Sequence, residues 1–159
     1  MPSTVKLHRV LGAPSRYRHS AIPHLMLADA ATAIDFYKAA FGAEEIFRIA
    51  DPSGTIIHGE IKIGQSVVML GDVDDRFREP RSAGGTTVGI HIYVEDVDQL
   101  FAKVSMAGAT VLQEPQDMVY GDRMTMLQDP FGHIWVFLQP LERLEPFEIV
   151  ERANKLFKS

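Results

Sequence analysis

Hydrophobic and polar positions follow the same order twice along the chain. Each copy begins with a short apolar segment, continues through an aspartate into a segment of helical period, and closes with several short alternating segments. The same number of residues separates His24 from His91 and Asp29 from Asp96. A pattern that returns at a fixed interval indicates an internal duplication. We therefore expect two modules with the same secondary structure.

Each copy predicts one amphipathic helix. Asp29 and Asp96 stand where an N-cap accepts hydrogen bonds from the free N–H groups of the first helical turn. Gly42 and Gly108 follow the last periodic positions, where a left-handed residue commonly ends a helix. Apolar residues three or four positions apart should share the buried side of each helix. They are Ala30, Ile34, Tyr37 and Phe41 in the first helix, and Val97, Leu100, Phe101 and Val104 in the second.

Short segments rich in β-favouring residues predict four strands in each copy, one before the helix and three after it. The predicted strands are residues 22–27, 45–50, 55–63 and 66–70, then 88–94, 110–114, 123–128 and 133–139. Asp-Pro-Ser-Gly at 51–54 and Asp-Pro-Phe-Gly at 129–132 suit type I turns. The chain then divides into an N-terminal arm (1–20), a βαβββ module (21–71), a linker (72–86), a second βαβββ module (87–140) and a helical tail (141–159).

The strand at 55–63 sorts its side chains by chemistry. Ile57, Gly59, Ile61 and Ile63 fall on one face, and His58, Glu60 and Lys62 fall on the other. Because successive side chains of a strand point to opposite faces, the apolar face should pack under a helix and the polar face should look into a cleft. The strands at 22–27 and 88–94 sort in the same way. The predicted cleft therefore collects His24, Met26, His58, Glu60, His91 and Tyr93.

Some of these residues suggest specific chemistry. A carboxylate beside an imidazole raises its pKa, so His58 and Glu60 could serve as a general base, or they could form a structural polar pair. Tyr120 could cover the cleft, while Asp122 and Arg123 could pair to fix the adjacent turn. Trp135 could pack in the core or form an aromatic wall for a flat ligand.

Composition narrows the classes of function. The chain has 159 residues, no cysteine and a net charge of −5. It therefore has no thiolate zinc site or disulfide framework, and it lacks the basic balance of a general nucleic-acid binder. No segment is apolar for the roughly 18 residues that a membrane-spanning helix needs. The arm is basic and acid-free, which suits a solvated arm or an edge strand; an organellar transit peptide is the alternative. We expect a cytoplasmic protein.

Four segments resemble a known superfamily: AIDFYKAAFGAEEIFRIADPSG, HGEIKIGQSVVML, HIYVEDVDQLFAKVSMAGATV and YGDRMTMLQDPFGHIWVF. Doubled modules with these segments look like the vicinal oxygen chelate superfamily of glyoxalases, extradiol dioxygenases, fosfomycin-resistance enzymes and bleomycin-binding proteins, and most like its PhnB-like branch. The resemblance implies an α+β fold in which tandem modules form a cup-shaped mixed sheet, with helices outside and a C-terminal helix added. A fold alone does not fix the activity.

Metal enzymes of the superfamily take one ligand from each of four strands. The resemblance places these positions at Ile22, at Val68 or Met69, at Gly89, and at Val136 or Phe137. None of these side chains offers the O or N donor that such a cation needs, so we expect no metal cofactor. A displaced site built from His24, His91 and Glu60 is the alternative.

These observations favour a metal-independent binder of a small organic ligand or antibiotic. The alternative is an enzyme of the lyase, isomerase or dioxygenase type that uses a displaced metal or His58 and Glu60. A third possibility is a protein that mainly serves assembly. Members of the superfamily commonly pair modules from two subunits, so we expect a homodimer, with Phe147, Val150 and Phe157 of the tail buried against the domain or the partner.

Overall fold

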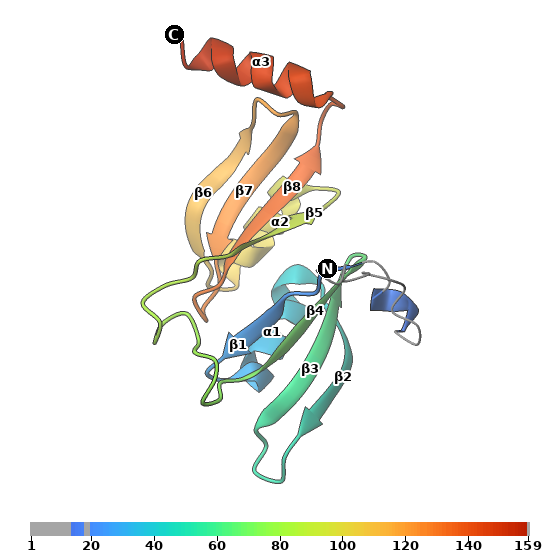
Figure 1. Ribbon diagram of the computed structural model, residues 1–159, viewed down its shortest axis with the longest axis vertical. Helices are drawn as coiled ribbons and strands as arrows, with labels where there is room; N and C mark the ends of the chain where they lie inside the picture. Colours follow the sequence, from blue (N-terminus) through green and yellow to red (C-terminus); the bar gives the residue numbers. More distant parts are fainter. Residues whose placement is uncertain (1–13, 18–19, 159) are drawn as a thin grey trace, which may run out of the picture.

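The computed structural model describes residues 14–17 and 20–158. Its elements follow the predicted order twice (Figure 1). After a 3₁₀ turn, η1 (Ser15–Tyr17), the first module holds β1 (His24–Leu27), α1 (Ala30–Phe41), β2 (Glu44–Ala50), β3 (Ile56–Ile63) and β4 (Ser66–Asp72). The second holds β5 (Gly89–Tyr93), α2 (Val97–Met106), β6 (Thr110–Asp117), β7 (Asp122–Gln128) and β8 (Ile134–Pro140), and α3 (Pro146–Leu156) closes the chain.

Each module forms its own four-stranded mixed sheet. The strand orders are β1-β4-β3-β2 and β5-β8-β7-β6, so the two sheets have the same topology. The first strand of each module pairs in parallel with the last, and the other neighbours are antiparallel. The α+β fold of two βαβββ modules with a C-terminal helix is confirmed. In Figure 1 the modules lie one above the other along the long axis of the molecule.

The predicted helix starts are confirmed by their hydrogen bonds. The Asp29 carboxylate accepts from the backbone N–H of Thr32 at 3.0 Å, and that of Asp96 accepts from Gln99 at 2.9 Å. Gly42 ends α1 with φ at 68°, in the left-handed region that a Cβ disfavours. Both helices therefore begin and end close to where the sequence predicts.

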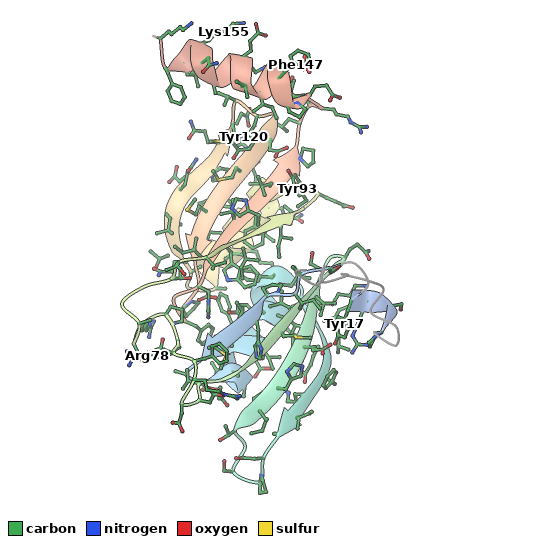
Figure 2. All side chains as sticks on the ribbon, in the orientation of Figure 1. Tyr17, Arg78, Tyr93, Tyr120, Phe147 and Lys155 are labelled. Carbon is green, nitrogen blue, oxygen red and sulfur yellow. The ribbon has the colours of Figure 1, made fainter. Side chains whose placement is uncertain are left out.

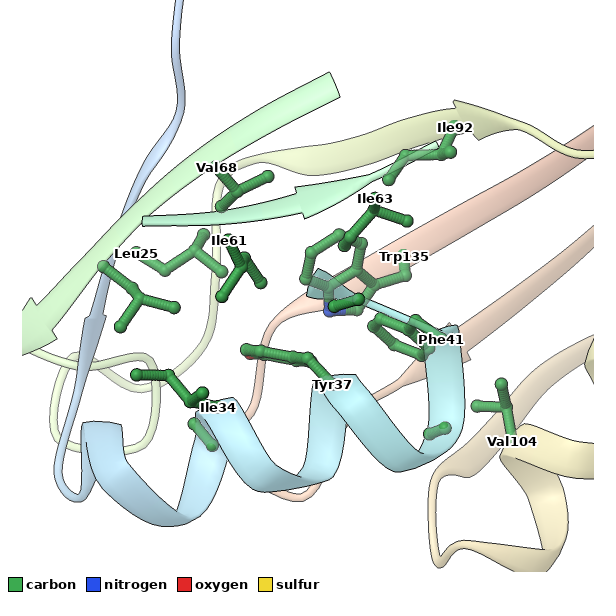
Figure 3. Packing of buried hydrophobic residues seen from close by; sticks show 14 of the residues in the cluster. Leu25, Ile34, Tyr37, Phe41, Ile61, Ile63, Val68, Ile92, Val104 and Trp135 are labelled. Carbon is green, nitrogen blue, oxygen red and sulfur yellow. The ribbon is translucent and has the colours of Figure 1, made fainter. Parts of the chain in front are cut away.

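One continuous core joins the two modules through α1 (Figure 3). Tyr37 and Phe41 of α1 contact Trp135 of the second module. Their ring centroids lie 5.3 Å and 4.8 Å from the indole. Trp135 and Phe137 are fully buried. Trp135 is therefore a core residue and does not form a ligand-facing wall.

The turn at 129–132 fixes this contact with a buried carboxylate. Asp129 accepts hydrogen bonds from the Tyr37 hydroxyl at 2.7 Å and from Trp135 Nε1 at 2.9 Å. Its other oxygen accepts from the backbone N–H groups of Phe131 and His133, each at 2.9 Å. The charge is thus surrounded by donors, as a buried carboxylate requires. The burial of Tyr37 and its bond to Asp129 raise the pKa of the phenol well above its ordinary value.

A β-bulge at the start of β3 changes which side chains face the helix there. The pairing with β2 shifts register between Ile49 and Ala50, which pair with His58 and Ile56. Ile56 consequently occupies the core, at 2% exposed, while Ile57 is 60% exposed. The expectation that Ile57 packs under the helix is wrong, because the extra residue of the bulge reverses the alternation at this end of the strand.

Helix α3 forms where the sequence predicts it but packs little against the domain. Phe147, Val150 and Phe157 are 69%, 58% and 85% exposed, so their burial against the domain is wrong. Burial against a partner subunit stays a prediction. Figure 2 shows Phe147 on this helix, which lies across the end of the second sheet. Within the described residues, no helix is long and apolar enough to cross a membrane.

Candidate ligand-binding faces

Each sheet has one face under its own helix and one face turned away from it, which we call its open face. On the first sheet, Leu25 and Ile61 are buried on the helix side. Alternation then places His24 and Glu60 on the open face, and β4 supplies Met69, which pairs with both of them. Met26 and His58 share this face.

Glu60 is the polar centre of the first open face. It is only 2% exposed. Its Oε1 lies 3.2 Å from His58 Nε2, and its Oε2 accepts a hydrogen bond from Arg16 Nε at 3.1 Å. Arg16 also donates to the Tyr17 hydroxyl at 2.8 Å. The prediction that Glu60 lies within hydrogen-bonding reach of a histidine is confirmed.

These contacts keep Glu60 charged. Burial alone would raise the pKa of Glu60, but hydrogen bonds from Tyr17, His58 and Arg16 outweigh it and hold the pKa below the usual value. The sequence did not point to Arg16 or Tyr17 as site residues, because both belong to the arm. Their basic and aromatic character was visible in the sequence, but their position beside the first sheet, where Figure 2 shows Tyr17, depends on tertiary folding.

Aromatic rings surround His58 on this face. The His24 ring of β1 lies 5.7 Å from it, edge to face, and the Phe47 ring of the adjacent strand β2 also lies 5.7 Å away. Phe47 pairs with Glu60 across β2 and β3, so it shares the open face. Partial burial, with a smaller contribution from His58, lowers the pKa of His24 and favours the neutral imidazole at neutral pH.

The open face of the second sheet is more apolar. Met124, Val136 and Leu138 are buried together there, with Met118, Tyr120 and Met126 packed against them. His91 pairs with Val136 and Tyr93 with Leu138, so both predicted residues reach this face. The Tyr93 hydroxyl donates to buried Asp122 at 3.1 Å, and that contact raises the pKa of the phenol.

The Arg123 side chain does not lie on the second open face. It points to the helix side and forms ion pairs with Asp98 of α2 and Asp117 of β6, at 2.7 Å and 2.6 Å. The expected pairing of Arg123 with Asp122 is therefore wrong, because alternation along β7 places the two side chains on opposite faces.

Two cavities adjoin the boundary between the modules. The smaller, about 250 Å³, is lined by Arg16, Ile22, Val68 and His91 among others. The larger, about 880 Å³, extends from the turn after β3 to β5 and α2, and includes His91 and Tyr93. His91 therefore contributes to both, whereas Glu60 and His58 line neither of them.

For two of the metal-ligand positions that the resemblance implies, the register of the sheets shows which alternative lies on an open face. Met69 lies on the open face and Val68 in the core; Val136 lies on the open face and Phe137 in the core. Hydrocarbon and thioether groups do not fit a hard or borderline cation. In the part of the chain that the structure describes, no group of three or more His, Asp or Glu side chains could hold a metal ion, so His24, His91 and Glu60 do not assemble a displaced site.

The family model of the Glyoxalase/Bleomycin resistance protein/Dioxygenase superfamily matches residues 19–137. The chain belongs to this superfamily. It is 43% identical over 132 residues to the uncharacterized proteins Mb0911c of Mycobacterium bovis and Rv0887c of Mycobacterium tuberculosis, which covers 80% of this chain and 87% and 78% of those relatives.

Solved structures of other proteins share the fold. TioX from Micromonospora sp. ML1 is 28% identical, with a TM-score of 0.62 over 79% of this chain and 99% of that one. The hypothetical protein SA1046 from S. aureus is 30% identical, with a TM-score of 0.57 over 77% and 97%. The fosfomycin resistance protein FosX from Listeria monocytogenes, complexed with Mn(II), is 17% identical with a TM-score of 0.61 over 86% and 98%, which is a likeness of fold alone.

Proposed function

We propose that this superfamily member binds a small organic molecule on its open faces without a metal ion. The observation that carries the proposal is the chemistry of the four positions that hold the metal in the superfamily's metal enzymes. Here they are Ile22, Met69, Gly89 and Val136. Such side chains suit contact with an organic surface and offer no ligand to a Lewis-acid cation.

A cavity at the boundary between the modules, which none of these four positions lines, supports the same function. Small-molecule pockets are mostly apolar, with a few placed polar groups, and measure roughly 300–1,000 Å³. The larger cavity, at about 880 Å³, falls in that range, and its lining combines apolar residues with His91, Tyr93 and the charged residues Glu95, Asp96 and Lys103. The methionines of the second open face, Met118, Met124 and Met126, add a polarizable surface that adapts to different ligands.

A thermal-shift panel tests the proposal. Purified protein is heated with organic compounds that include metal-free bleomycin, and each measurement is repeated with EDTA and with added Mn²⁺ or Zn²⁺. A compound that binds the folded state raises the melting temperature by mass action. We expect equal shifts with and without EDTA. A shift that vanishes with EDTA and returns with metal would contradict the proposal.

A second candidate function rests on the contact between His58 and Glu60. A carboxylate 3.2 Å from an imidazole nitrogen can orient it as a general base, which suits an enzyme of this superfamily. Arg16 holds the other carboxylate oxygen in place. Mass spectrometry of a ligand released from the protein separates the two functions, because a binder returns the compound unchanged and an enzyme returns a product.

We also propose that the protein is a homodimer. We further propose that it is cytoplasmic and that it belongs to the PhnB-like branch of the superfamily. Exposed apolar side chains support the dimer: Tyr93, Phe147 and Phe157 leave more than half of their surface uncovered. Sedimentation of wild type and of a Phe147→Ser, Phe157→Ser double variant tests it. Dimer mass in wild type that is lost in the variant is expected, and monomer mass for both would contradict this assembly.

A further inference from the structure

We infer that the first open face selects an organic cation, and that the protein's own Arg16 occupies the position of that cation when no ligand is bound. The inference rests on the proposed function and specifies its ligand class. It starts from Glu60, whose carboxylate is almost completely covered. A buried charge is stable only with an opposite charge or several donors next to it.

The sheet does not provide that cation by itself. Within the described residues, Glu60 forms ion pairs with His58 of its own strand and with Arg16 of the arm. The histidine carries a full charge only when protonated, whereas a guanidinium is always charged. The permanent positive partner of Glu60 therefore comes from outside the sheet.

The described part of the segment that carries Arg16 lies at the surface. Turn η1 contains three residues, and none of them is buried. The Arg16 side chain is 37% exposed, while that of Glu60 is 3% exposed. Because Arg16 is partly exposed, its side chain can move into solvent, whereas Glu60 stays buried and still needs a positive partner. A ligand cation can therefore take the place of Arg16 beside Glu60 without the loss of core packing, because it supplies the charge that Arg16 withdraws.

The space around the pair fits a flat cation. Arg16 itself lines the cavity of about 250 Å³, so its withdrawal would extend that cavity toward Glu60. The rings of His24 and Phe47 lie on either side of His58, each with its centroid 5.7 Å from it. Guanidinium and amidinium groups pair with a carboxylate in a planar, two-pronged geometry and stack against aromatic rings. The ligand class that this face recognises is thus an aromatic or aliphatic amidine or guanidine.

Calorimetric titration with benzamidine tests the inference, and benzamide serves as the neutral compound of the same shape. We expect wild type to prefer benzamidine. Arg16→Ala should bind it at least about threefold more tightly, because removal of a competing internal group raises the fraction of competent protein. Glu60→Gln should lose most of the preference. Arg48→Ala and Glu45→Gln remove another such pair in the same module and should bind like wild type.

Three results would overturn the inference. The first is a folded Arg16→Ala variant that does not bind benzamidine. Circular dichroism verifies the fold of this variant and of Glu60→Gln separately. The second is equal binding of benzamide and benzamidine. The third is unchanged benzamidine binding by a folded Glu60→Gln variant. Binding of neutral compounds without a metal would leave the proposed function standing, so the two failures are distinguishable.

Discussion

The two open faces occupy equivalent places in a duplicated backbone but differ in their chemistry. The first is centred on charged Glu60, which contacts His58 and Arg16. The second is centred on Met124, Val136 and Leu138. The helix sides of both sheets, by contrast, remain apolar and merge into a single core. The shared fold therefore depends on the helix sides, while the open faces were free to diverge in their chemistry.

The two Asp-Pro turns show the same divergence at a smaller scale. Asp51 is solvent-accessible and accepts hydrogen bonds within its own turn, from Ser53 and Thr55. Asp129 is buried and holds Tyr37 of the other module. One motif therefore closes a local turn in the first copy and joins the modules in the second.

The largest predicted effect separates these two turns. Asp129→Ala should lower the free energy of unfolding by about 3–5 kcal/mol, because the buried donors of Tyr37 and Trp135 lose their acceptor. Asp51→Ala, the matched substitution, should cost about 1 kcal/mol or less, since water can replace its bonds. Urea denaturation of both variants checks this. Equal losses would contradict a special role for the second turn.

A smaller effect separates the two open faces. Leu138→Ala removes a side chain that is 4% exposed, and should cost about 2–3 kcal/mol through lost burial and a new cavity. Met69→Ala, on the partly exposed first open face, should cost about 1 kcal/mol. Thermal and urea unfolding measure both. If Met69→Ala cost more, the first open face would be part of the core rather than a binding surface.

The smallest effect concerns the charge of Glu60. Its pKa is lower in the folded protein than the ordinary 4.5, so the unfolded chain takes up the proton first as the pH falls. The stabilisation is complete above pH 4.5 and is lost as the pH falls below it, through the folded-state pKa. Glu60→Gln should therefore be less stable than wild type at pH 7, by about 1 kcal/mol or less.

The difference in stability between wild type and Glu60→Gln should become smaller as the pH falls below 4.5. Unfolding of wild type and Glu60→Gln is measured from pH 7 down to the acid transition, with Glu44→Gln as a control for an exposed carboxylate on the same sheet. A stability difference that stays constant below pH 4.5 would show that the charge of Glu60 is not stabilised by its neighbours.

Much of the fold was predictable because it depends on local patterns. The cap positions of Asp29 and Asp96, the helical periodicity and the repeated turns specify the two modules. Alternation also placed His58 beside Glu60 correctly. It failed at Ile57, because a bulge depends on the partner strand, and it could not locate Arg16 on Glu60, because that contact joins segments far apart in the chain. The role of Asp129 was missed for the same reason.

The central claim is that the superfamily's backbone is retained here without its metal ligands, and restoring the ligands tests it. The combined variant Ile22→His, Gly89→His, Val136→Glu places donors at three of the four positions. The backbone at Gly89 has room, since an added Cβ would meet its nearest neighbour, His91 Nε2, at 3.8 Å. Circular dichroism verifies that the variant folds.

Calorimetric titration of Mn²⁺ and Zn²⁺ into wild type and into this variant is the most direct measurement. We predict no stoichiometric binding by wild type and a clear gain of affinity in the variant, because His and carboxylate ligands suit these cations. Equal, negligible binding by both proteins would show that the positions have been wrongly assigned. Tight binding of about one ion per chain by wild type, in the affinity range of built protein metal sites, would contradict the account.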